Sequence, residues 1–118
     1  IDGRAQYQVE VAESAVAKAR GLSYRESLAS DTGMLFVFSQ AETRYFWMNA
    51  MHFPLDGVWI RDGLIVGLQE NITHPEANNG ETARFESPEP ADMVLEVNAG
   101  EISKQGIKTG QRIEVKKP

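Results

Sequence analysis

Four short apolar runs follow one another in the middle of the chain, and this rhythm constrains the fold more than any other feature. The runs are residues 34–38, 45–48, 55–60 and 64–68. Each has the length of a buried β-strand, and Asp62-Gly63 between the last two is a strong signal for a two-residue hairpin. Because both faces of residues 55–60 are apolar, we expect this strand to have neighbours on both sides.

The remaining patterns predict further strands and short helices around these runs. Tyr7, Val9 and Val11 alternate with polar residues, which predicts a half-buried strand. The other expected elements are a helix from the N-cap Ser14 to Gly21, a helical turn from Ser23 to Leu28, a strand at 93–97, a helical turn at 100–106 and a strand at 112–116. Residues 70–91 carry three prolines and predict a long loop.

These elements define the expected fold class. There are about seven short strands, and most connections are too short for parallel crossovers. The sequence therefore predicts a mainly β (α+β) fold, with a compact, barrel-like, mostly antiparallel sheet and two or three short helices. The length of 118 residues fits one domain over 1–118.

The composition excludes several classes of function. The net charge of −5, without a basic cluster, argues against nucleic-acid binding, because that affinity depends on neutralising phosphates. The chain has no cysteine, and its two histidines lack metal-ligand spacing, so we expect no metal and no cofactor. No apolar stretch reaches about 20 residues, so we expect no membrane span in this chain.

Six short motifs together resemble one known family. They are Arg20-Gly21-Leu22 with Arg25, Gly33-Met34-Leu35-Phe36-Val37-Phe38, Trp47-Met48-Asn49, Pro54-Leu55-Asp56, Pro90-Ala91 before Val94-Leu95-Glu96, and Gly106-Ile107-Lys108 before Gly110. Their order resembles domain-of-unknown-function family 192, a group of small bacterial and archaeal proteins, over about residues 9–115. Ser23 and Gln111 depart from the family pattern. The resemblance implies a periplasmic or otherwise extracytoplasmic location, because members often carry an export signal or lipid anchor, and it implies no particular activity.

Asp56 is the most informative single residue. It shares a strand face with Val58 and Ile60, so its carboxylate should be at least partly buried and should need a cation or several hydrogen-bond donors. The candidate partners are Arg20, Arg25 and Arg44. Three interpretations stay open: a structural ion pair, a site carboxylate with a shifted pKa, and a turn cap after Pro54.

Glu96 poses the same question on a later strand. A structural pair with Arg84 or Arg20 is one interpretation. Convergence with Asp56 is another, because two carboxyl groups at a suitable separation perform glycosidase-type acid–base chemistry. His52 is a third candidate catalytic residue, although a solvent-facing position in a loop explains it better.

One segment combines aromatic and polar residues and predicts a ligand pocket. The expected lining is Trp47, Met48, Asn49, Met51, His52 and Asp56, closed by Arg84 and Phe85 from the long loop. The alternative is that Trp47 and Phe85 belong to the core.

Three functions follow from these observations. The first is a noncatalytic module of the cell envelope that binds a small molecule, sugar or peptide. The second is a structural or interaction protein of the envelope without a small ligand. The third is a hydrolase that uses Asp56 and Glu96.

Overall fold

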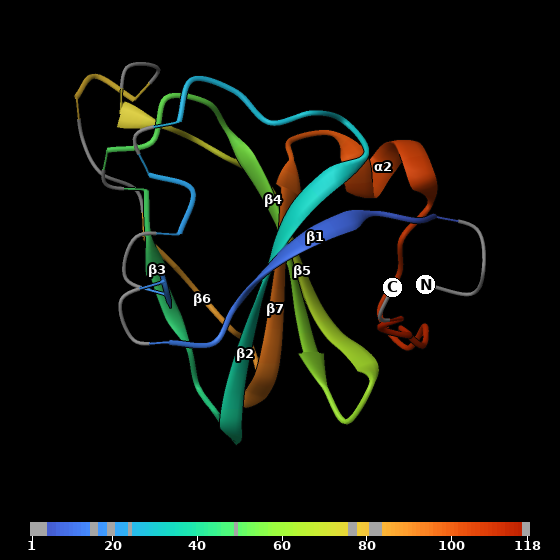
Figure 1. The fold of residues 1–118 in the computed structure, drawn as a ribbon. Helices are drawn as coiled ribbons and strands as arrows, with labels where there is room; N and C mark the ends of the chain where they lie inside the picture. The colour runs from blue at the N-terminus through green and yellow to red at the C-terminus, as the bar shows by residue number, and fades with distance from the viewer. Residues whose placement is uncertain are drawn as a thin grey trace.

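Seven β-strands carry the architecture of the computed structural model (Figure 1), which describes residues 5–14, 17–18, 21–23, 25–48, 50–75, 78–80 and 84–116. The strands are β1 (Gln8–Ala12), β2 (Thr32–Glu42), β3 (Tyr45–Trp47), β4 (Leu55–Arg61), β5 (Leu64–Ile72), β6 (Arg84–Glu86) and β7 (Ala91–Asn98). The helix α2 (Glu101–Gln105) follows β7. The fold is therefore mainly β, as the sequence predicts.

The main sheet is open rather than barrel-like. Its strand order is β1-β2-β7-β4-β5, with β1 parallel to β2 and the other pairs antiparallel, and β3 and β6 form a separate two-stranded sheet. The edge of β5 meets the C-terminal segment instead of β1, because Ile65 N donates to Gln111 O at 2.9 Å and Ile113 N donates to Gly63 O at 2.9 Å. The expected strand at 112–116 contributes only one bridge, between Leu64 and Arg112.

The hairpin between β4 and β5 confirms the strongest local prediction. Asp62 has φ 52° and Gly63 has φ 76°, and Arg61 pairs with Leu64 across the turn. Two central residues with positive φ define the type I′ turn that matches the twist of the strands. As expected, β4 lies between β7 and β5, and its residues 55–60 are buried.

The prediction of one continuous loop at 70–91 is wrong, because three strands occupy parts of this range. Strand β5 continues to Ile72, β7 begins at Ala91, and β6 pairs with β3. Phe85 holds β6 against β3, because the buried ring of Phe85 stacks on the ring of Phe46 with the centroids 5.4 Å apart. A three-residue strand between polar and proline-rich stretches gives no periodic signal that would predict it.

Helical structure is more limited than expected. Helix α2 confirms the turn at 100–106, and it is the helix whose full length falls within the described residues. Near Ser14, the Oγ atom accepts a hydrogen bond from Ala17 N at 3.0 Å, as an N-cap does, but most of that turn lies outside the described residues. The turn expected from Ser23 to Leu28 is wrong, because the described residues 25–28 are not helical. The expectation of two or three helices is thus not confirmed.

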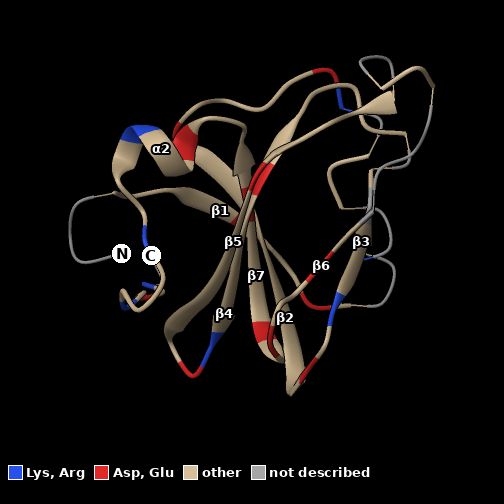
Figure 2. Ribbon diagram, turned by 180° about the vertical axis from the view of Figure 1, so that it is seen from behind, with Lys and Arg blue, Asp and Glu red and all other residues tan. Residues whose placement is uncertain are grey.

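The main sheet buries both of its faces. Alternate residues point to opposite sides. One face, here the β6 face, carries Met34, Phe36, Trp59 and Val94 and packs against Phe85. The other, here the α2 face, carries Leu35, Val58, Ile60 and Val97 and packs against Ile102 and Ile107. Figures 1 and 2 show α2 on one side of the sheet and β3 with β6 on the other. This separation decides where each candidate site residue lies.

Candidate functional site

Asp56 is fully buried on the α2 face, and backbone amides satisfy its carboxylate. Asn71 N donates to Oδ1 at 2.8 Å, and Gly100 N and Ile102 N donate to Oδ2 at 3.0 Å and 2.9 Å. A carboxylate at this position accepts donors that the start of a helix leaves without partners. Asp56 therefore fastens α2 and the end of β5 to β4. The burial that the sequence indicates is present, but the role is structural.

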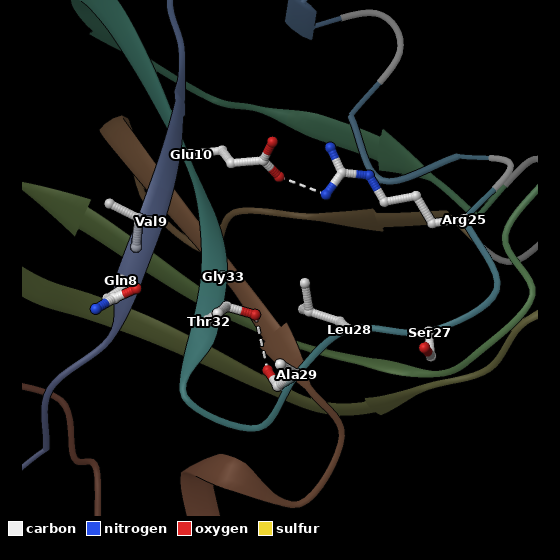
Figure 3. A pocket seen from close by; sticks show the side chains of 9 residues that line it. All are labelled: Gln8, Val9, Glu10, Arg25, Ser27, Leu28, Ala29, Thr32 and Gly33. Atoms are coloured by element: carbon white, nitrogen blue, oxygen red, sulfur yellow. Dashed lines mark hydrogen bonds and ion pairs between the residues drawn. The ribbon is translucent and has the colours of Figure 1, made fainter.

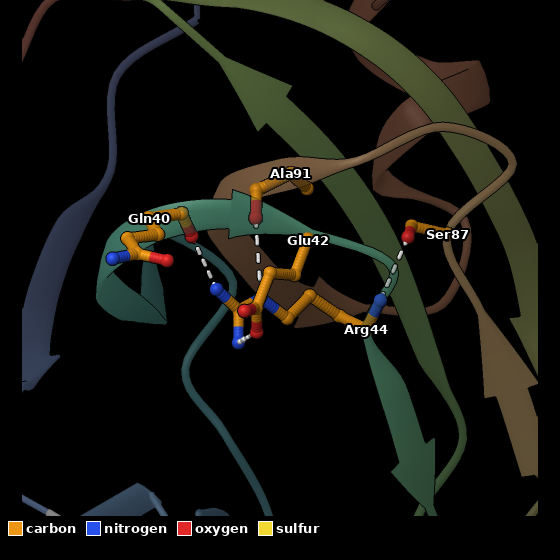
Figure 4. Close-up of polar contacts among 5 residues, drawn as sticks. All are labelled: Gln40, Glu42, Arg44, Ser87 and Ala91. Carbon is orange, nitrogen blue, oxygen red and sulfur yellow. Dashed lines mark hydrogen bonds and ion pairs between the residues drawn. The ribbon is translucent and has the colours of Figure 1, made fainter.

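None of the described arginines is the partner of Asp56. Arg25 forms an ion pair with Glu10 on the other side of the molecule, and Arg20 lies outside the described residues. Arg44 ties the end of β2 to the start of β7 (Figure 4). Its Nε donates to Ala91 O at 3.2 Å, its Nη2 donates to Gln40 O, and its guanidinium lies 3.8 Å from the centroid of the Phe38 ring.

A second polar contact closes the α2 face. The hydroxyl of Tyr7 donates to Glu101 Oε1 at 2.8 Å, and Glu101 is itself buried at the start of α2. Burial, followed by the hydrogen bond to Glu101, raises the pKa of Tyr7 above its ordinary value. The acidic groups on this face thus already have partners within the fold.

The predicted pocket does not assemble as a set. Met48 and Met51 are 1% and 3% exposed and belong to the core of the β6 face, as does the buried Phe85. Asp56 lies across the sheet from them, and His52 is exposed. Asn49 and the side chains of Trp47 and Arg84 lie outside the described residues. The core alternative therefore holds for Phe85, and the methionines also fill the core rather than an open rim.

Glu96 lies on the β6 face, where it pairs across the strands with Met34 and with Gly57. Asp56 pairs with Val97 on the opposite face, so the sheet separates the two carboxyl groups that a hydrolase would need together. Glu96 is only 5% exposed. No hydrogen bond or ion pair joins it to any described residue, and burial raises its pKa to about 8. An acid in this state binds its proton at neutral pH.

A groove of about 410 Å³ lies between β1 and the segment 25–29 (Figure 3). Its lining consists of Gln8, Val9, Glu10, Arg25, Ser27, Leu28, Ala29, Thr32 and Gly33. At one end the Arg25 guanidinium reaches Glu10, and at the other Thr32 Oγ1 donates to Ala29 O at 2.8 Å. The Leu28 side chain lies between these two contacts. The hydrogen bond from Arg25 lowers the pKa of Glu10, so this pair is charged at neutral pH.

Glu96 does not line this groove itself, but it lies on β7, the strand next to the groove residue Thr32 on β2. Met34 on β2 pairs with Glu96 on β7. The groove residue Thr32, two residues before Met34, is therefore the diagonal neighbour of Glu96 on the same face, at about 7–8 Å between Cα atoms. Asn98, two residues after Glu96 on this face, donates through Nδ2 to Leu28 O. The segment that forms the groove wall is thus attached beside Glu96. Sequence reasoning missed this groove, because it depends on the parallel register of β1 and β2 and on the path of residues 25–29.

Fold and site together define a class: a small domain with an open, mostly antiparallel sheet and a groove at its β1 edge. Within this class the chain belongs to the family DUF192, described as "Uncharacterized ACR", which it matches over residues 1–115. This confirms the resemblance seen in the sequence motifs.

Two solved structures share this fold. A protein of Sinorhizobium meliloti 1021, described as a candidate transcription regulator, is 36% identical with a TM-score of 0.83, over 92% of this chain and 81% of the other. A protein of unknown function from Novosphingobium aromaticivorans DSM 12444 is 26% identical with a TM-score of 0.83, over 92% and 75%. No curated protein matches the chain.

The described residues lack two further features. They contain no helix with the length and apolar character needed to cross a membrane. They also contain no group of three or more His, Asp or Glu side chains placed to hold a metal ion.

Proposed function

We propose that this protein is a noncatalytic binding module that takes a small molecule or a short peptide or sugar segment into the groove beside β1. The observation that carries the proposal is the groove itself, whose lining residue Thr32 is the diagonal neighbour of Glu96, a buried acid without a hydrogen-bond partner among the described residues. Buried polar groups are normally hydrogen-bonded, so one without a partner needs an explanation. A ligand supplies that explanation. Location at the cell envelope is part of the proposal, and it rests on the export signals or lipid anchors that members of the family often carry.

The geometry gives no comparable support to a hydrolase. Asp56 is committed to three backbone amides, and Glu96 lies on the other face of the sheet. His52 is exposed. A reaction that needs two converging carboxyl groups has no place for its substrate here.

An interaction protein of the envelope is the second candidate, and β1 is the observation that favours it. This strand is an edge of the main sheet, and Val11 on it is 49% exposed. An exposed edge can pair with an extended peptide through its main chain. We rank this candidate second, because an edge strand alone selects no partner.

The description of the Sinorhizobium meliloti protein would make nucleic acid a third candidate. The charge of this chain argues against it. The net charge is −5, and Figure 2 shows basic and acidic residues interspersed over the described ribbon, with no continuous basic stripe. Phosphate binding requires such a stripe.

A thermal-shift screen tests the proposal. The screen covers envelope sugars, peptides, amines and metal ions, since a ligand that binds only the native state raises the melting temperature. Ser27→Trp fills the groove, and Ser30→Trp nearby, outside the groove lining, is the matched control. We expect hits whose shift is lost in Ser27→Trp and kept in Ser30→Trp. Hits that bind Ser27→Trp as well as wild type would contradict the groove as the site.

A further inference from the structure

We infer that Glu96 makes this groove a receptor for a primary alkylammonium group, such as a free alkylamine or the side chain of a peptide lysine. The inference rests on the proposed function, because it names the ligand class for the same groove. Nothing in the family description assigns a ligand to this region.

The surroundings of Glu96 select a cation. A buried carboxylate is stable only beside a positive group or several hydrogen-bond donors. Glu96 has neither among the described residues, whereas Asp56 on the opposite face has three donors. An ammonium group combines one positive charge with three donors on a compact head. It therefore supplies both of the missing interactions at once.

The charges of the groove leave room for one added cation. Among the described residues, the charged groups that line the groove are Glu10 on β1 and Arg25 on the segment 25–29. They form an ion pair, so their charges cancel. The cross-strand neighbours of Glu96, Met34 on β2 and Gly57 on β4, carry no charge. An ionised Glu96 would give the site a net charge of −1, which one ammonium group cancels.

The groove also fits the alkyl part of such a ligand. Leu28 supplies apolar lining on the face that carries Glu96, and it is held beside Glu96 through the bond from Asn98 to its carbonyl oxygen. A four-carbon chain laid along Leu28 would bring its ammonium head towards the diagonal between Thr32 and Glu96. The Thr32 hydroxyl donates a hydrogen bond to Ala29 O. The lone pairs of its oxygen therefore remain available to accept a hydrogen bond from the ligand.

Binding at neutral pH must release a proton. The Glu96 carboxyl gives its proton to the buffer and becomes a carboxylate that receives the N–H groups of the ammonium ion. The ligand keeps its own proton, because an alkylammonium ion resembles the lysine side chain, which titrates near ~10.4. One proton is therefore released for each ligand bound below the pKa of Glu96.

Calorimetric titration with four probes tests this inference on the full chain. The probes are butylamine, N-acetyl-lysine N-methylamide as a peptide lysine, butan-1-ol as a neutral analogue and butyrate as an anion. We expect binding of at least one of the two ammonium probes, with affinity rising about tenfold from pH 6 to pH 7 and levelling off above pH 8. Titration in buffers of different ionisation enthalpy should show close to one proton released at pH 6.5.

Glu96→Gln is the test variant, and Glu26→Gln, an exposed glutamate outside the groove lining, is its matched control. We expect Glu96→Gln to lose the proton release and at least about tenfold in affinity, and Glu26→Gln to lose neither. Thermal unfolding of both variants confirms that they fold. Binding of butylamine alone identifies free amines as the source of the ammonium group, and binding of the lysine amide alone identifies peptides.

Other results would overturn the inference. Binding of butan-1-ol or butyrate without the ammonium probes, lost in Ser27→Trp, would preserve the groove and reject the ligand class. Ammonium binding without proton release, unchanged in Glu96→Gln, would reject Glu96 as its receptor. Absence of binding by all four probes would reject the inference and leave the proposed function to the wider screen.

Discussion

Asp56 and Glu96 lie on neighbouring strands of one sheet, and their carboxyl groups have opposite surroundings. Asp56 faces α2, is fully buried and accepts three backbone hydrogen bonds. Glu96 points to the β6 face, is almost as buried and accepts none from the described residues, and burial raises its pKa to about 8. The burial of an acid therefore does not indicate its role. The hydrogen-bond donors around the acid do.

This difference separates a structural region from the region that we propose binds a ligand. On the α2 face the two buried acids, Asp56 and Glu101, both have partners within the fold. On the groove side the fold keeps one acid without a partner, at a cost in stability. Proteins tolerate such a cost where it serves a function. The predictions below measure how far the two regions differ.

The largest effect is expected for Asp56→Ala. The substitution leaves three buried N–H groups without an acceptor, at a cost on the order of 3 kcal/mol or more in the free energy of unfolding. Urea denaturation at pH 7 measures it. Asp56→Asn, which keeps one acceptor oxygen, should lose clearly less. A loss below about 0.5 kcal/mol for Asp56→Ala would show that α2 does not depend on this carboxylate.

The second effect concerns the pH dependence caused by Glu96. Its folded pKa of about 8 lies above the ordinary 4.5, so the folded state holds a proton that the unfolded state releases between these values. Stability should therefore be unaffected by Glu96 below pH 4.5, fall as pH rises towards 8, and stay reduced above it, by about 1.4 kcal/mol per pH unit at most within that window.

Glu96→Gln isolates this contribution. Between pH 5 and pH 7, wild type should lose on the order of 2 kcal/mol relative to the variant in urea denaturation. The difference between the two proteins cancels the titration of all other groups. Parallel pH profiles for wild type and Glu96→Gln would mean that Glu96 is ionised in the folded protein.

A smaller effect is expected for Tyr7→Phe on the α2 face. The variant loses the hydrogen bond to Glu101 Oε1 and leaves a buried carboxylate with one donor fewer, which should cost about 1–2 kcal/mol. Denaturation at pH 7 gives the value. If the double variant Tyr7→Phe with Asp56→Ala costs less than the sum of the two single variants, the two contacts act together in holding α2.

The smallest effect is expected for Arg25→Ala at the rim of the groove. The side chains of Arg25 and Glu10 are 37% and 59% exposed, so their ion pair should contribute no more than about 0.5 kcal/mol. Because the pair lowers the pKa of Glu10 below 4.5, its contribution is present above that pH and lost as pH falls through the folded pKa. A loss comparable with that of Asp56→Ala would mean that the rim is structural as well.

The sequence predicts the strands well where periodicity or turn chemistry is strong. Residues 55–60, the Asp62-Gly63 hairpin and the turn at 100–106 are found as expected. Closure of the sheet and the short strand β6 are not predictable in this way. They depend on contacts between distant segments, such as Phe85 with Phe46, rather than on a local pattern.

The predictions for the site residues show the same division between local sequence patterns and contacts between distant segments. The burial of Asp56 follows from its place beside Val58 and Ile60, and the structure confirms it. Its partners are the backbone amides of residues 71, 100 and 102, which residue types do not reveal. The expected pairing with Arg25 or Arg44 is therefore wrong, whereas Arg20 lies outside the described residues. The separation of Asp56 from Glu96 follows from the register of β4 with β7, which becomes known only with the fold.

Titration of the Glu96 side-chain carboxyl carbon by nuclear magnetic resonance tests the central difference most directly. The resonance is assigned by its absence in Glu96→Gln and followed from pH 4 to pH 10. We predict a single transition near pH 8, with the folded state confirmed across the range by circular dichroism. A transition near the ordinary value of 4.5 would show that Glu96 has a partner or solvent in the folded protein, and would contradict the account.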